Sequence, residues 1–208
     1  MKEEGVHKKI IDCLVPYIGK WAKDKKKIII GIEGSSGSGK SALSYSLNKI
    51  FKKSIRLSTD LYIKKEKDLF LRCKKSKNAF DFFTKEYFDF KLLKKHLVKF
   101  KNAKKGDSLI FYVYGKKYKV DLTKQILFLD GVFLCHDREF SKLIDKKIFL
   151  VLDLKEIKIR RNLRVVQPGS KNKGINIAKR FDIAWKKYLE LKMADKKSNI
   201  ILNIKVLH

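Results

Sequence analysis

The stretch Gly34-Ser35-Ser36-Gly37-Ser38-Gly39-Lys40-Ser41 decides the fold that we predict for this chain. It fits the pattern G-x-x-x-x-G-K-[S/T] at every defined position. The apolar run 28–32 before it predicts a buried strand, and apolar residues at helical spacing after it predict a helix. Glycines let the backbone N–H groups of such a loop point inward, and the following helix begins with its unpaired N–H groups and its positive dipole end at the same place. The sequence therefore predicts a seat for a polyphosphate between a strand and a helix.

Two side chains of this loop have predicted chemical roles. The Lys40 ammonium would reach the β- and γ-phosphates of a nucleotide, and the Ser41 hydroxyl would bind Mg²⁺. A Ser/Gly-rich turn can match the pattern by chance, but the strand and helix beside it favour the phosphate site. A phosphate loop predicts nucleotide binding only, so catalysis has to be argued from other residues.

Length and cysteine usage limit the class of protein. A chain of 208 residues can fill one core but is short for two ordinary domains, so we expect a single domain over residues 1–208. The three cysteines stand far apart with no C-x-x-C pair, which favours a reducing, cytoplasmic setting over a zinc or disulfide framework. No apolar run has the length of a membrane span, and no signal-peptide pattern opens the chain.

The net charge of +29 comes almost entirely from lysine. Such a charge often indicates nucleic acid or an anionic membrane as a partner. Here the lysines are spread over every segment, whereas arginine, the usual reader of phosphates and base edges, occurs seven times. We therefore attribute the excess to compositional bias and expect neither nucleic acid nor a membrane as partner, while a homo-oligomer stays open.

Two aspartates follow predicted strands. Residues 54–58 read as a short strand shortly before Asp60, and residues 126–129 as a buried strand that ends at Asp130. Because ligands bind at the carboxyl ends of parallel strands, both carboxylates are expected beside the phosphate loop. Asp130 would hold Mg²⁺ directly or through water. For Asp60, position alone leaves a helix N-cap or a turn as an equal alternative.

Three arginines lie on a helix predicted over residues 155–164, namely Arg160, Arg161 and Arg164. A solvated basic face is one interpretation. Guanidinium groups beside a phosphate site also stabilise charge on a phosphoryl group in transfer, and we favour that interpretation. Turn residues follow, and they predict a lid loop at about 165–174.

The remaining patterns predict the elements around this site. An additional amphipathic helix is expected within residues 1–24, and a mobile loop over 64–77. The other expected elements are a helix over 88–100, a hairpin from 109–114 and 118–122, a helix over 177–191 and a strand within 199–206.

In this order the motifs resemble the uridine kinase family, within the phosphoribulokinase and uridine kinase group of P-loop kinases. The resemblance runs from about Ile28 to Ile201. It rests on the phosphate loop, Ser58-Thr59-Asp60, Phe80-Asp81 with Phe88-Asp89, Val113-Tyr114, Leu129-Asp130-Gly131, and Asp153 followed by Arg160-Arg161-Asn162-Leu163-Arg164. The loop is shared by many families, and the ordered series of the rest is more specific.

The resemblance implies a fold and a reaction. The fold is a P-loop NTPase three-layer α/β/α sandwich, with a mostly parallel five-stranded sheet and a small β-hairpin and lid insertion. The reaction is transfer of the γ-phosphate of ATP, with Mg²⁺, to a small alcohol, first of all the 5′-hydroxyl of uridine or cytidine. Nicotinamide riboside, pantothenate or a sugar alcohol are alternative acceptors. From another class, a non-catalytic nucleotide-binding protein with a basic RNA-binding surface stays open.

The resemblance also implies residue roles. Asp60 would take the proton of the attacking hydroxyl, Lys40 would neutralise the γ-phosphate, and Arg161 with Arg164 would clamp the transferring group. Mg²⁺ would be held by Ser41, Asp130 and Asp60. The residues expected to bind ATP are Gly34, Ser35, Ser36, Gly37, Ser38, Gly39, Lys40, Ser41 and Arg160. The residues expected to bind the acceptor are Phe80, Asp81, Tyr114 and Tyr62.

This chain departs from the family pattern around the acceptor. Phe82-Phe83 replaces a His-Pro pair, Gly115 replaces an acid, and Lys119 or its neighbours replace a base-reading histidine. The lid has Lys171 and Lys173 in place of Arg-Gly-Arg. Since hydrogen-bonded readout carries the larger selectivity factors, we expect weak discrimination in favour of a pyrimidine.

Overall fold

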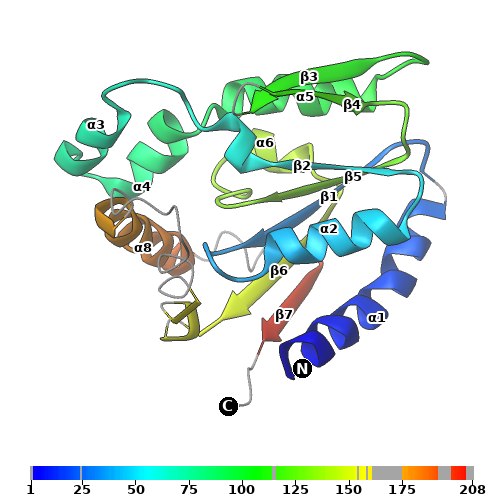
Figure 1. Ribbon diagram of the computed structural model, residues 1–208, viewed down its shortest axis with the longest axis horizontal. Helices are drawn as coiled ribbons and strands as arrows, with labels where there is room; N and C mark the ends of the chain where they lie inside the picture. Colours follow the sequence, from blue (N-terminus) through cyan, green and yellow to red (C-terminus); the bar gives the residue numbers. More distant parts are fainter. Residues whose placement is uncertain are drawn as a thin grey trace.

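A five-stranded parallel sheet forms the centre of the computed structural model, which describes residues 2–23, 25–113, 116–153, 155–157, 159–160, 175–191 and 198–204. The strand order is β2-β5-β1-β6-β7 (Figure 1). The bounds are β1 (Ile28–Gly34), β2 (Ser54–Ser58), β5 (Ile126–Gly131), β6 (Lys146–Leu152) and β7 (Ile200–Ile204). β1 and β5 are buried along their whole length, as central strands covered on both faces must be. The register pairs Ile32 with Asp130, so the phosphate loop and Asp130 leave the sheet at one edge.

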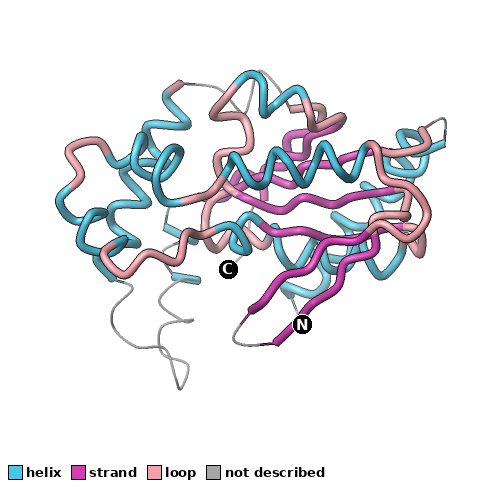
Figure 2. The backbone as a smooth tube through the Cα atoms, turned by 90° about the horizontal axis from the view of Figure 1, so that it is seen from above, coloured by secondary structure: helices cyan, strands magenta, loops and turns pink. Residues whose placement is uncertain are grey.

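Helices cover both faces of this sheet and make three layers (Figures 1 and 2). On one face, α1 (Lys2–Lys23) and α2 (Lys40–Ile50) bury Leu14, Ile18 and Leu47 against the side of the central strands that carries Ile30 and Phe128. On the other face, a larger core joins the sheet to α5 (Phe90–Lys101), α6 (Arg138–Lys142) and α8 (Ile175–Glu190). The expected three-layer fold with a five-stranded sheet is therefore confirmed.

The smaller additions lie beside α5, at the top of Figure 1, and at the carboxyl end of the sheet. β3 (Ser108–Val113) and β4 (Lys116–Asp121) pair antiparallel as the expected hairpin. α3 (Leu69–Lys75), α4 (Ala79–Asp81) and α8 gather at the carboxyl end of the strands, at the left of Figure 1. In the part of the chain that the structure describes, none of the helices has both the length and the apolar character that crossing a membrane requires.

Two expected elements were wrong in detail. The segment 64–77 contains α3 where a mobile loop was expected, because Leu69 and Cys73 lie one helical turn apart and are both buried. The helix expected from residue 88 begins at Phe90. Its N-cap is Asp89, whose side chain accepts a hydrogen bond from Leu92 N at 2.8 Å. A π-helix, η2 (Phe82–Tyr87), occupies the segment before it.

Candidate functional site

The phosphate loop runs from the end of β1 into α2 in a conformation that requires its glycines. Gly37 and Gly39 have φ angles of 91° and 88°, in the left-handed region that favours glycine. A Cβ on Gly34 would lie 2.4 Å from the Ser38 Oγ. The Lys40 Nζ donates a hydrogen bond across the loop to the Ser35 carbonyl at 3.1 Å. The loop is therefore closed on itself, with Lys40 lying over it.

Asp130 is fully buried at the end of β5, where its carboxylate joins the loop helix to β2. The Ser41 Oγ donates to Oδ1 at 2.9 Å, and the Ser44 Oγ donates to Oδ2 at 2.9 Å. The Arg56 guanidinium donates to both oxygens, at 2.7 and 3.3 Å. This two-pronged pair offsets the cost of burying the carboxylate charge. The Ser41 proton is directed toward Asp130, which leaves the lone pairs of that hydroxyl oxygen for a metal.

The donor atoms of this site fit Mg²⁺, which prefers oxygen ligands. Ser41 and the exposed Asp60 both line the same cavity, while Asp130 lies behind Ser41 and is paired with Arg56. Among the described residues, no group of three His, Cys, Asp or Glu is arranged to bind a metal. A Mg²⁺ ion here would therefore take most of its ligands from phosphate and water, as it commonly does.

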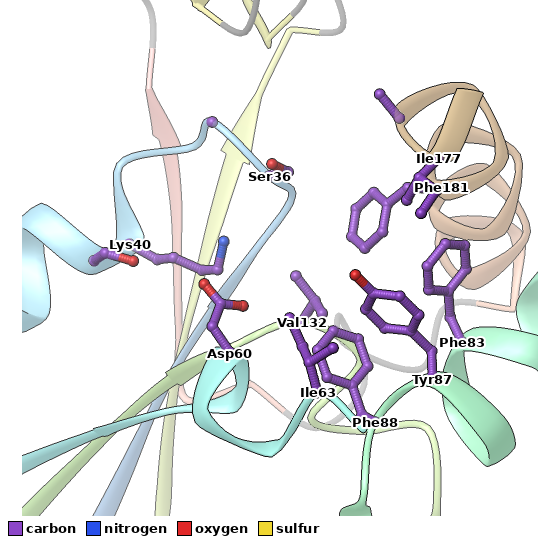
Figure 3. Close-up of a pocket in the computed structure, with 13 residues that line it drawn as sticks. Ser36, Lys40, Asp60, Ile63, Phe83, Tyr87, Phe88, Val132, Ile177 and Phe181 are labelled. Carbon is purple, nitrogen blue, oxygen red and sulfur yellow. The ribbon is translucent and has the colours of Figure 1, made fainter. Parts of the chain in front are cut away.

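A cavity of about 280 Å³ lies beside the loop (Figure 3). One end is lined by loop residues and by Asp60. The other end is apolar and is built from several elements. Its lining residues are Ile63, Phe83, Tyr87, Phe88, Val132, Ile177, Ala178 and Phe181. The cavity thus joins a phosphate seat to an apolar wall, with Asp60 between them.

Asp60 belongs to a short 3₁₀ turn, η1 (Thr59–Tyr62), that follows β2. The Ser58 side chain caps this turn, because its Oγ accepts a hydrogen bond from Asp60 N at 3.3 Å. The capping role that position alone left open for Asp60 therefore belongs to Ser58. Figure 3 shows the Asp60 carboxylate and the Lys40 amine extending into the same space.

Three residues expected to bind the acceptor do not line this cavity. The Asp81 carboxylate forms an ion pair with Lys85 at 3.2 Å on the surface. Phe80 stacks on Tyr188, with ring centroids 6.2 Å apart. Tyr62 is buried and its hydroxyl forms a hydrogen bond with His96 Nδ1 at 2.8 Å. For Phe80 and Asp81 the physical reason is the local backbone, because the following segment η2 places Phe83 and Tyr87 in the cavity wall instead.

Other expected site residues lie outside the described part of the chain, namely Tyr114, Arg161 and Arg164, together with the lid loop at about 165–174. Arg160 is described. Its Nε donates to Glu156 Oε1 at 2.7 Å, one helical turn away, and Arg160 is not among the residues that line the cavity.

The sequence analysis missed Glu33, a buried acid directly behind the loop. Its Oε1 accepts hydrogen bonds from Leu134 N at 2.6 Å and from the Tyr188 hydroxyl at 2.7 Å. Burial raises the pKa of Glu33 to about 7, although these hydrogen bonds act in the opposite direction. The sequence signal that could have identified Glu33 was a charged residue in an otherwise apolar strand. Arg56 in β2 gave a similar signal, and the sequence analysis missed it as well.

Comparisons with known proteins bear on the family and the fold. A model of the phosphoribulokinase / uridine kinase family matches residues 29–196. A uridine kinase from Clostridium novyi is 30% identical over 151 residues, covering 68% of this chain and 70% of the relative. A nicotinamide riboside kinase from Schizosaccharomyces pombe is 28% identical over 155 residues, covering 67% of each chain. The solved structure of "a possible uridine kinase" from Bacillus stearothermophilus has a TM-score of 0.64 at 20% identity, covering 98% of this chain and 100% of that one, which shows the shared fold.

Proposed function

The chain belongs to the phosphoribulokinase / uridine kinase family, and from this premise we propose that it transfers the γ-phosphate of ATP to a hydroxyl of a small molecule. Family membership implies a P-loop kinase that binds ATP, with Mg²⁺ as the usual metal. The observation that carries the proposal is the position of Asp60, whose carboxylate lines the same cavity as Lys40 and Ser41. In-line phosphoryl transfer needs this arrangement of a base opposite a phosphate seat.

In this proposal each residue has a defined task. Asp60 accepts the proton of the acceptor hydroxyl, and Lys40 holds the charge of the γ-phosphate. Ser41, oriented by Asp130, and Asp60 would hold Mg²⁺, which neutralises phosphate charge. Arg161 and Arg164 are proposed to clamp the transferring group, and Arg160 to bind ATP. Residues 1–208 would form one kinase domain, with α1 as an addition and residues 165–174 as the lid.

For the acceptor, we place nucleosides first, with the 5′-hydroxyl of uridine or cytidine as the reacting group. The name of the Clostridium relative supports this choice. Nicotinamide riboside is the second candidate, supported by the name of the Schizosaccharomyces pombe relative.

A phosphate-transfer assay tests the proposal. The protein is incubated with Mg²⁺-ATP and, separately, with uridine, cytidine, nicotinamide riboside and pantothenate, and mass spectrometry follows the gain of one phosphate. We expect a product from at least one nucleoside, and none with Lys40→Ala. Lys20→Ala, at an exposed position on α1, is the matched control and should retain the activity. ATP binding without any phosphorylated acceptor would contradict the proposal.

A further inference from the structure

The apolar end of the cavity indicates how the acceptor is recognised. The whole cavity has a volume of about 280 Å³. In the proposed function the phosphates of ATP would occupy its loop end. This volume is at the low end of the range for ligand pockets. The space beyond Asp60 therefore suits one small ring better than a larger body. Its walls, Phe83, Phe88, Phe181 and Ile177, offer ring faces and methyl groups.

Tyr87 provides a polar group within this apolar wall. Figure 3 shows its hydroxyl directed into the cavity from η2. Its ring is fixed by neighbouring rings, with centroids 5.0 Å from Phe83 and 4.9 Å from Phe88. Burial, with a smaller contribution from Asp60, raises the pKa of Tyr87 to about 12, so the hydroxyl keeps its proton at neutral pH and can donate a hydrogen bond.

A sugar diol would find few partners in the described part of this wall. Asp81, the acid expected to grip a sugar, faces Lys85 on the surface instead. Beyond the phosphate loop, the polar side chains among the described lining residues are Asp60 and Tyr87. The proposed chemistry uses Asp60 for the reacting hydroxyl, so Tyr87 is the polar side chain of this set that remains for other groups of the acceptor. Hydroxyls buried against apolar groups without hydrogen bonds lose free energy relative to water. Vicinal hydroxyls should therefore add little affinity here.

We propose that this site selects its acceptor by a single flat ring, which packs on Phe83, Phe88, Ile177 and Phe181 and accepts a hydrogen bond from Tyr87, and that it does not read a sugar's vicinal hydroxyls. The acceptor class is thus ring-bearing alcohols, deoxynucleosides included, and excludes polyols without a ring base. This inference rests on the proposed kinase function and specifies its acceptor.

Binding of a matched series of probes tests the inference independently of turnover. Calorimetry in the presence of Mg²⁺ and a non-hydrolysable ATP analogue compares uridine, 2′,3′-dideoxyuridine, 3-pyridinemethanol and D-ribose. Dideoxyuridine keeps the ring and the 5′-hydroxyl but lacks the diol, whereas ribose keeps the diol but lacks the base. We expect uridine and dideoxyuridine to bind within about threefold of each other, and 3-pyridinemethanol to bind measurably. Ribose should bind at least about thirtyfold more weakly than uridine.

Two variants test the named wall residues. Tyr87→Phe should weaken binding of the ring probes by about three- to tenfold, because it removes one hydrogen bond. Ile177→Ala should weaken binding by about fivefold, because it removes apolar contact. Tyr112→Phe on the exposed face of β3, and Ile183→Ala on the exposed side of α8, are matched controls that should change binding less than about twofold.

The outcomes separate this inference from the proposed function. Ribose binding as tightly as uridine would overturn the inference, as would a loss of more than about thirtyfold on removal of the diol, or no binding by any ring probe. Unchanged binding in both wall variants would also overturn it. Ring probes that bind but are never phosphorylated would contradict the kinase function and leave the selection by a ring in place.

Discussion

Asp60 is the residue on which the proposed chemistry depends most directly. Its carboxylate is exposed to the cavity and lies opposite the loop that would hold the γ-phosphate. A carboxylate in this position can accept a proton as the acceptor oxygen attacks. The assignment of Asp60 as general base stays a prediction that kinetics can test.

Replacing Asp60 by Asn should lower turnover by at least about a hundredfold while ATP binding stays within about twofold. The amide keeps the size of the side chain but cannot accept the proton. Steady-state kinetics with the best acceptor, together with calorimetry of an ATP analogue, measures both quantities. Turnover that survives the substitution would remove Asp60 from this role.

Glu33 ties the stability of the fold to pH at the residue scale. The folded protein keeps the Glu33 proton up to about pH 7, whereas an unperturbed glutamate releases it near 4.5. The nearest titratable groups, Tyr188 and Cys135, have raised pKa values and stay neutral across this range. Because the folded state binds more protons between these values, the free energy of unfolding falls as pH rises from about 4.5 to 7.

The Glu33→Gln variant should lose this pH dependence, which amounts to about 3 kcal/mol over the whole window. Urea unfolding at several pH values between 4.5 and 7.5 measures the slope. Glu190→Gln, at an exposed position near the end of α8, is the control and should keep the wild-type slope. An unchanged slope in Glu33→Gln would show that Glu33 titrates normally in the folded protein.

At the scale of elements, the sequence predicted the segments with strong local patterns. The buried strands β1 and β5 and the amphipathic helix α8 lie where their apolar periodicity indicated. The sequence analysis missed α3 because its few apolar residues stand among many lysines, so the helical spacing is short and weak. It missed η2 because no local pattern distinguishes a π-helix from an α-helix. η2 matters for the site, since it carries Phe83 and Tyr87 into the cavity.

α1 is an element that we expect to serve packing. Leu14 and Ile18 are fully buried against the sheet, and none of the α1 side chains that the structure describes lines the candidate site. Leu14→Ala should lower the free energy of unfolding by about 3 kcal/mol without changing the KM for ATP. Urea unfolding and initial rates measure the two effects. Cys13→Ala, at an exposed position of the same helix, is the control, and equal destabilisation by both variants would contradict the packing argument.

For the whole molecule, the net charge of +29 creates a positive field. Diffuse lysines should hold RNA weakly at about 50 mM salt and release it by about 200 mM. Retention on immobilised RNA over a salt gradient measures this dependence. Lys40→Ala should not alter it, because one loop lysine contributes little to a field of this size. Retention at high salt would instead indicate a built nucleic-acid surface.

The sequence by itself determined the phosphate loop and the strands around it, because each is a run of contiguous residues with a local physical reason. It also determined the family, through the order of several short motifs along the chain. Tertiary structure alone decided which distant groups meet. The Tyr188 hydroxyl reaches Glu33 over a separation of 155 residues, and Arg56 reaches Asp130 over 74. It also placed Tyr87 in the cavity wall and Asp81 on the surface. Such pairings depend on how helices pack across a parallel sheet, and the local periodicity of the sequence does not predict that packing.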